Sequence, residues 1–239
     1  SFSIRAANDM SAVAINTGAN QTVEKADLNA RVQTHNDGVT INVDSSTFTI
    51  NGKAWTIANN GKVELRSNTP ASGLLTMREG EQQIDIRTRP GANGRNDIDI
   101  ELTKLNLGDF GPYILPKNRL EGLLSGSVRI TDPTGDLRVT SDNIHTAFLQ
   151  LDNDSLGEVV AKLDYSKKTK ELRFSGNSVN MEHGVEFDGH LFLGDRSLAL
   201  QNNIRIRAHQ FELKVLERFL GNLFSDIDGL LTGNISLDG

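Results

Sequence analysis

Three acidic residues on one expected strand come closest to a catalytic arrangement in this sequence. Asp97, Asp99 and Glu101 alternate with apolar residues, so a strand would place them on one face at intervals of about 6.6 Å. A pair of carboxylates at such spacing can serve as acid and base in glycoside hydrolysis. A matching strand later in the chain carries Arg205 and Arg207 at two of these positions. We therefore interpret the carboxylates as part of a solvated sheet face, and we predict no catalytic residue and no enzymatic activity.

Candidate metal ligands are also poorly placed. Residues 152–157 partly match a calcium-binding loop, but Leu156 stands where a ligand is required and Leu163 stands where the closing Glu would be. None of the five histidines has a zinc-binding spacing, and His183 and His190 form only a loose cluster. The absence of cysteine excludes disulfides and thiolate ligands. We expect neither a metal nor another cofactor.

The composition predicts a thin core. Hydrophobic residues make up 37% of the chain, whereas roughly 45–50% is typical of globular domains. Aromatic residues make up only 5%. We therefore expect an open or elongated body, with Trp55 in its core. The net charge of −6 and the lack of a dense Lys/Arg run argue against a nucleic-acid partner, because phosphate binding requires clustered positive charge.

Targeting signals are not visible in the sequence. No apolar stretch approaches the roughly 20 residues that a membrane-spanning helix requires, and no signal peptide is recognisable. Since the chain starts in a strand-like pattern and stops at Asp238-Gly239, we interpret it as a fragment whose anchoring segment lies elsewhere.

Strict alternation of apolar and polar residues runs through most of the chain and predicts β-strands with one buried and one exposed face. Clear examples are 83–87, 97–102 and 203–207, and turn signals such as 51–52 and 132–135 separate the strands. The polar partners are mostly charged, so one face of the sheet stays in water. The sequence therefore predicts an all-β fold, a long curled antiparallel-rich sheet with one or two short helices.

The apolar positions define an inward face that we expect to line a groove. Helical patterns that could cover this face are scarce. The best of them, at 214–224, leads us to assign Leu216, Phe219 and Leu220 to a helix in the groove. One short helix cannot cover so many strands, so the sheet must close on itself or hold a ligand. The predicted lining residues on the strands are Val63, Leu65, Ile84, Ile86, Ile98, Ile100, Leu102, Val128, Ile130, Leu137, Val139, Phe174, Phe187, Ile204, Ile206, Ile235 and Leu237.

An internal repeat supports this architecture. Residues 121–130 match 228–237, which lie 107 positions later, and 97–100 match 203–206, which lie 106 positions later. Each unit runs from alternating strands through a short helix or turn to an acidic-Gly-Leu-Leu-Ser/Thr-Gly strand, whose glycines predict a bend or bulge. Such a period is too long for one coil of an ordinary solenoid.

The repeat gives a division of the chain. We place a partial first unit at 1–120, and a second unit with the start of the next at 121–239, in one continuous sheet without a linker. In the first copy the helix is expected to be weak, because Gly111 and Pro112 both disfavour it.

The repeated blocks resemble a known family. The junction at 211–239, with its Leu-Glu-Arg-Phe-Leu and Asp-Gly-Leu-Leu-Thr-Gly segments, is similar to the repeat junction of the TamB (translocation and assembly module) family. The segments 54–57, 61–65 and 84–107 are also similar to it, and the resemblance covers most of 40–239. This family belongs to the AsmA-like, bridge-like lipid transfer group.

The resemblance implies a U-shaped, taco-like sheet whose apolar interior shields phospholipid acyl chains between the inner and outer membranes of a Gram-negative envelope. It implies a periplasmic location, with anchorage in the inner membrane by a segment outside this sequence. The implied partners are phospholipid acyl chains, adjacent repeats of the same chain, and an outer-membrane barrel assembly protein of the Omp85 type, with a role in outer-membrane protein assembly. No catalytic or cofactor-binding residue is implied.

Two other classes of protein are the alternatives. A structural β-solenoid or adhesin-type stalk without lipid would have a closed, side-chain-filled core and a short regular coil, and the long period counts against it. A carbohydrate-active β protein would need a cleft with converging aromatic and acidic residues, and the aromatic content of 5% counts against that.

Overall fold

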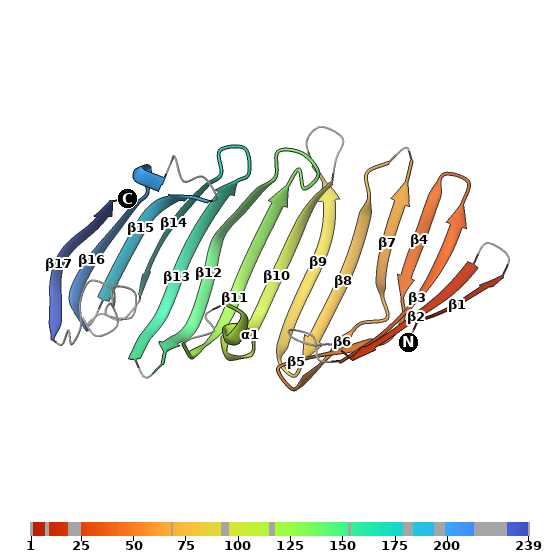
Figure 1. The fold of residues 1–239 in the computed structure, drawn as a ribbon, viewed down its shortest axis with the longest axis horizontal. Coiled ribbons are helices and arrows are strands. Elements are labelled where there is room, and N and C mark those ends of the chain that lie inside the picture. The colour runs from red at the N-terminus through yellow and green to blue at the C-terminus, as the bar shows by residue number, and fades with distance from the viewer. Residues whose placement is uncertain are drawn as a thin grey trace.

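The protein is all-β, as the alternation predicted, and its strands form one 17-stranded sheet in a computed structural model. All the strand pairings are antiparallel. The structure describes residues 2–7, 10–18, 25–67, 69–91, 96–114, 118–152, 154–178, 184–193, 199–212 and 229–238. Figure 1 shows the sheet running from β1 at the right to β17 at the left, with one helix at an edge near β10 and β11.

The elements follow each other as a meander. The first nine strands are β1 (Phe2–Ala7), β2 (Met10–Gly18), β3 (Lys25–His35), β4 (Gly38–Val43), β5 (Ser46–Ile50), β6 (Lys53–Ile57), β7 (Gly61–Arg66), β8 (Ser72–Glu79) and β9 (Gln82–Pro90). The remaining elements are β10 (Asn96–Asn106), α1 (Leu107–Ile114), β11 (Leu120–Thr131), β12 (Arg138–Leu151), β13 (Asp154–Ser166), β14 (Glu171–Ser178), β15 (Gly184–Phe192), a short 3-10 turn (Ala199–Gln201), β16 (Asn203–Glu212) and β17 (Leu230–Asp238).

Two of the early strands are broken by bends. The first half of β3 pairs with β5 and its second half pairs with β4, so β4 and β5 form one bent strand. In the same way β8 pairs first with β7 and then with β6. From β8 onward each strand pairs with its neighbours in sequence.

The internal repeat is reproduced in the strand register. The pair Ile98–Ile130 between β10 and β11 has its counterpart in the pair Ile204–Leu237 between β16 and β17. Both strand pairs contain a β-bulge in their first strand, where two residues lie opposite one. The bulged residues are Lys104 (φ 47°) and Gln210 (φ 47°), one repeat apart.

The bulges are also held by equivalent hydrogen bonds. The N–H of Lys104 donates to Ser125 Oγ at 2.9 Å, and the N–H of Gln210 donates to Thr232 Oγ1 at 3.0 Å. Ser125 and Thr232 occupy the same place in the repeated Gly-Leu-Leu-Ser/Thr-Gly block. The hydroxyl group of this Ser or Thr thus accepts a hydrogen bond from the backbone N–H that the bulge removes from the regular pairing between the strands.

Gly126 in β11 offers a test of how tightly neighbouring strands fit. It has a φ of 148°, and a Cβ at this position would lie 2.6 Å from the carbonyl oxygen of Asn143 in β12. Gly80, at the tip of the β8–β9 turn, has a φ of 54° and would meet nothing within 4 Å. Both substitutions to Ala carry a backbone cost, but only the first adds a steric clash.

We expect Gly80→Ala to lower the free energy of unfolding by about 1 kcal/mol, and Gly126→Ala to lower it by a further 1–3 kcal/mol or so, because strand β12 must shift. Urea unfolding followed by circular dichroism measures both changes. Equal effects of the two substitutions would show that the backbone of β12 does not constrain position 126.

Candidate apolar binding face

Apolar side chains from successive strands form rows across one face of the sheet, here called the inner face. In one row Leu75, Ile86, Ile100 and Val128 come from β8, β9, β10 and β11. Their alternation places them on the same side, because side chains on a strand point to opposite faces in turn. All the predicted strand lining residues lie on this face except Leu137, which precedes β12.

The rows continue to the C-terminal strands. Phe187 of β15 lies opposite Ile206 of β16, which lies opposite Ile235 of β17. The next row contains Ile204 and Leu237. The predicted groove helix, with Leu216, Phe219 and Leu220, falls outside the described residues.

The inner face is only partly covered. In the part of the chain that the structure describes, the buried hydrophobic residues are Ala26, Trp55, Leu105, Leu151, Val159, Ala208 and Phe211. The predicted lining residues are half-buried, apart from Leu65, which is 44% exposed. A side chain packed beneath a second layer would be buried, so these rows retain apolar surface that is accessible to another molecule.

Two phenylalanines cover glycines on this face. Phe187 lies directly opposite Gly176, and Phe174 lies directly opposite Gly189. A Cβ on Gly176 would lie 2.5 Å from the Phe187 ring, and one on Gly189 would lie 3.1 Å from the Phe174 ring. The two rings are 6.4 Å apart between centroids. Each ring thus lies over the glycine of a neighbouring strand, an arrangement that was not predicted, because glycines were interpreted only as turn or bulge signals.

Helix α1 packs against this face at one end through aromatic contacts. Phe110 meets Trp55 edge-on at 6.1 Å, and Trp55 stacks on Phe48 at 6.1 Å with an interplanar angle of 14°. Trp55 is fully buried, which confirms its predicted place in the core. The helix forms in spite of Pro112, because tertiary packing outweighs the loss of one intrahelical hydrogen bond.

An ion pair to a buried carboxylate fixes the orientation of α1. The carboxylate of Asp109 is 4% exposed and lies 2.9 Å from Lys53 Nζ in β6. Gln82 Nε2 in β9 donates to the same carboxylate at 2.9 Å. Because β6 and β9 lie on either side of β8, these contacts tie the helix across several strands of the sheet.

We expect Lys53→Met to lower the free energy of unfolding by about 2 kcal/mol, because Asp109 would remain buried without a cation. The double variant Lys53→Met/Asp109→Asn should recover most of this loss, since the amide carries no charge that must be compensated. Urea denaturation of the three proteins tests this, and a double variant as unstable as the single one would contradict it.

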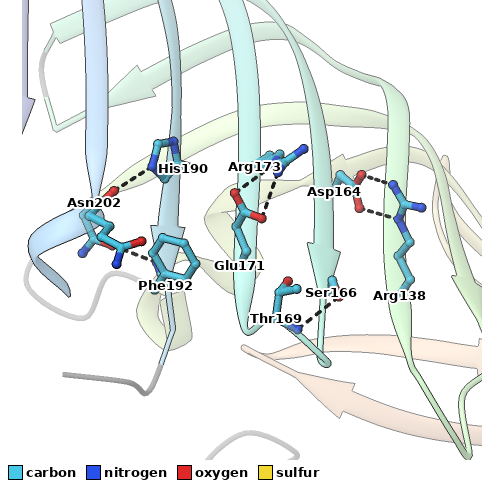
Figure 2. A network of polar contacts seen from close by, with 10 residues as sticks. Arg138, Asp164, Ser166, Thr169, Glu171, Arg173, His190, Phe192 and Asn202 are labelled. Carbon is cyan, nitrogen blue, oxygen red and sulfur yellow. Dashed lines mark hydrogen bonds and ion pairs between the residues drawn. The ribbon is translucent and has the colours of Figure 1, made fainter. Parts of the chain in front are cut away.

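The opposite face of the sheet, here called the outer face, carries cross-strand ion pairs. Figure 2 shows part of this network on β12–β14, where Arg138 makes two contacts with Asp164 on the neighbouring strand and Arg173 contacts Glu171 within β14. Further along, Arg205 pairs with Asp188. These groups are exposed or half-exposed, so each pair contributes little stability by itself. Their main effect is to keep this face in water.

The three candidate carboxylates lie on the outer face. Asp99 forms ion pairs with Arg129 at 2.9 Å and with Arg89 at 3.4 Å. Asp97 differs from the prediction of a solvated side chain, because it is 9% exposed and accepts the N–H of Asp132 at 3.3 Å. Only Glu101 is exposed. Asp97 and Asp99 therefore have structural partners.

A metal centre and a membrane-spanning helix are two further features that a chain of this kind could carry. Among the described residues, no group of three or more His, Asp or Glu side chains could hold a metal ion. No helix within the described ranges is long and apolar enough to span a membrane.

Comparison with protein-family models, with curated proteins and with solved structures gives no match.

The ion pair between Arg138 and Asp164 predicts a pH dependence. The hydrogen bond from Arg138 holds the pKa of Asp164 below its ordinary value of 3.8. A carboxylate with a lowered folded pKa stabilises the fold above its unfolded pKa, and this stabilisation disappears as the pH falls through the folded pKa.

We therefore expect Asp164→Asn to lower the free energy of unfolding near neutral pH by about 0.5 kcal/mol. This change should be seen as a slightly lower melting temperature. The difference from the wild type should shrink between neutral pH and an acidic pH below 3.8, because the stabilisation is lost as the folded protein binds a proton at Asp164. Thermal melts followed by circular dichroism at both pH values check this, and a difference that persists in acid would contradict the ion-pair origin.

Proposed function

We propose that this chain is a groove segment of a lipid transport protein, and that its inner face shields phospholipid acyl chains. The observation that carries the proposal is that apolar side chains, most of them half-buried, recur on the inner face of every strand from β7 to β17. An acyl chain on such rows would gain about 0.8 kcal/mol for each methylene removed from water.

The composition of the rows suits movement along the sheet. Aliphatic and phenylalanine side chains make non-directional contacts, so a bound chain gains similar free energy at successive positions. The polar headgroup would remain in water beyond the rows. This arrangement favours transport along the groove over tight binding at a single place.

The resemblance to the TamB family supports the same function. On this proposal the chain is part of a larger protein that crosses the periplasm from an inner-membrane anchor outside this sequence. It would carry phospholipid between the two membranes and would assist outer-membrane protein assembly with a barrel protein of the Omp85 type. The all-β sheet and its repeated register are compatible with this family.

A structural stalk without lipid is the alternative. A β-solenoid would have parallel strands in successive coils around a filled core. The pairings in the described residues are all antiparallel, and the rows are half-buried. Both observations favour the lipid groove over the stalk.

The experiment compares two adjacent positions on β10. Leu102 belongs to the inner face, whereas Thr103 is exposed on the outer face. We expect phospholipid to co-purify with the wild-type chain, and we expect Leu102→Asp to reduce the lipid per protein several-fold, because it places a charge among the acyl chains. Thr103→Asp introduces the same charge on the wet face and should leave the lipid content unchanged.

Lipid extraction followed by mass spectrometry measures the bound phospholipid, and circular dichroism confirms that both variants are folded. Equal lipid content in all three proteins, or no phospholipid bound to the wild type even after incubation with phospholipid vesicles, would contradict the proposed groove.

A further inference from the structure

Burial on the inner face differs between the two edges of the sheet where its strands turn. Helix α1 follows the end of β10 at one of them, here called the helix edge, and the turn between β13 and β14 lies at the opposite edge (Figure 1). The seven buried hydrophobic residues all lie in the half of the sheet nearer the helix edge. The apolar side chains nearer the opposite edge are half-buried or exposed. Among the described residues, the inner face is therefore most accessible along the edge away from α1.

An apolar row ends beside the β13–β14 turn at this opposite edge. It contains Val139, Tyr165, Leu172 and Leu191, which lie opposite one another on four successive strands. All four are half-buried. Tyr165 has a polar tip, and its hydroxyl group makes no hydrogen bond to a described residue. A tyrosine at the boundary between an apolar surface and water is suited to a ligand that also has an apolar part and a polar part.

The β13–β14 turn carries three lysines in four positions. Lys167, Lys168 and Lys170 are all exposed. The N–H of Lys167 donates to the carbonyl oxygen of Leu137 at 3.0 Å, and the N–H of Leu193 donates to the carbonyl oxygen of Lys170 at 2.8 Å. The backbone of the turn is thus tied to the connections on both sides of it, and it presents the lysine side chains from a fixed base.

The positive charge of this turn is not cancelled by its surroundings. Two arginines that flank the turn, on β12 and β14, are already paired with carboxylates (Figure 2). Within the described part of the chain, neither Lys167 nor Lys168 has an ion pair. The three lysines outnumber the acids of the neighbouring β11–β12 turn, Asp132 and Asp136, although the net charge of the chain is −6. The turn is therefore a local positive site at the end of an apolar row.

We propose that Tyr165, Lys167 and Lys168 form a headgroup site, which binds the phosphate of a phospholipid whose acyl chains lie on the inner face. The row holds the chains, the ammonium groups attract the phosphate, and the tyrosine hydroxyl group donates a hydrogen bond to it. Clustered lysines favour lipids with a net negative charge. The site therefore selects anionic headgroups over zwitterionic ones. This inference rests on the proposed lipid groove, to which it adds a place and a charge for the headgroup.

The exposure of the lysines limits the strength of the site. Attraction between exposed charges is screened by salt, so a headgroup is held less firmly there than by buried ion pairs. The acidic β11–β12 turn at the same edge offers no lysine or arginine among its residues 132–137. A lipid that moves along the inner face thus meets a preferred position at β13–β14, and the free energy that holds it there is small enough for it to move on.

The test uses the full chain and vesicles that contain equal amounts of phosphatidylethanolamine and phosphatidylglycerol. After incubation the protein is separated from the vesicles, and mass spectrometry measures the total bound lipid and the ratio of the two lipids. We expect the wild type to bind the anionic phosphatidylglycerol in about threefold excess or more. The double variant Lys167→Gln/Lys168→Gln should bring this ratio close to that of the vesicles. Its total bound lipid should stay the same, because the apolar rows are intact.

A second double variant, Lys25→Gln/Lys162→Gln, is the matched control, since it removes the same charge elsewhere. Lys25 is exposed at the start of β3, and Lys162 is exposed on the outer face of β13. This control should keep the preference of the wild type. Replacement of Lys167 and Lys168 by arginine should also keep it, because the charge remains. Tyr165→Phe should reduce it by less than the glutamine variant does, because only a hydroxyl group is lost. Circular dichroism checks that each variant is folded.

The outcomes separate this inference from the proposed function. A wild type that binds no phospholipid would overturn both. A wild type that binds the two lipids in the ratio of the vesicles would leave the groove in place and overturn the headgroup site alone. An equal loss of preference in the matched control would show an effect of net charge, and it would also overturn the site.

Two further measurements distinguish other binding partners of the lysines. Inorganic phosphate should leave the lipid ratio as it is in chloride of equal ionic strength, because phosphate lacks the acyl chains that supply most of the affinity. A loss of preference in phosphate alone would assign the lysines to free phosphate. Sedimentation with the same vesicles is the second measurement. If the glutamine variant lost this sedimentation but kept the lipid ratio of the wild type, the turn would bind a membrane surface and the inference would be wrong.

Discussion

The structure depends on a pairing register that keeps the apolar side chains of all 17 strands on one face of the sheet. A shift of one residue in any pairing would move a whole set of side chains to the other face. Each bulge adds one residue to one strand, which by itself would move the side chains that follow it to the opposite face. The sequence compensates by spacing apolar residues three apart at the bulge, as Leu102 and Leu105 show in β10.

Strand β12 applies the same compensation repeatedly. Its inner positions include Val139, Ser141, Ile144 and Thr146, so the spacing changes from two to three where the register with β13 shifts. The bulge between Ser141 and Ile144 also brings Asn143 into position to accept the N–H of Ser127. The irregular segments of the sheet thus keep its two faces separate and satisfy the amides that the ladder leaves unpaired.

Local periodicity was sufficient to predict the strands and their faces. Alternation identified the strands and assigned residues such as Ile100 and Ile206 to one face, and the repeat identified hairpins that share a register. Contacts between distant segments could not be predicted in this way. The packing of Phe110 on Trp55 and the burial of Asp109 beside Lys53 join parts of the chain that are more than fifty residues apart, and no local pattern encodes such contacts. The pairing of Phe187 with Gly176 was missed for the same reason, since it requires knowledge of which strands are neighbours.

The equivalence of the β10–β11 and β16–β17 hairpins has a consequence for the geometry of growth. The two hairpins are six strands apart, and strands in a sheet are spaced by about 4.8 Å, so one repeat advances the sheet by about 29 Å. A barrel has a fixed number of strands because its first and last strands must pair. An open meander whose apolar side chains stay on one face has no such limit on its number of strands. Duplication of one unit therefore lengthens the sheet by a fixed step without disturbing the units already present.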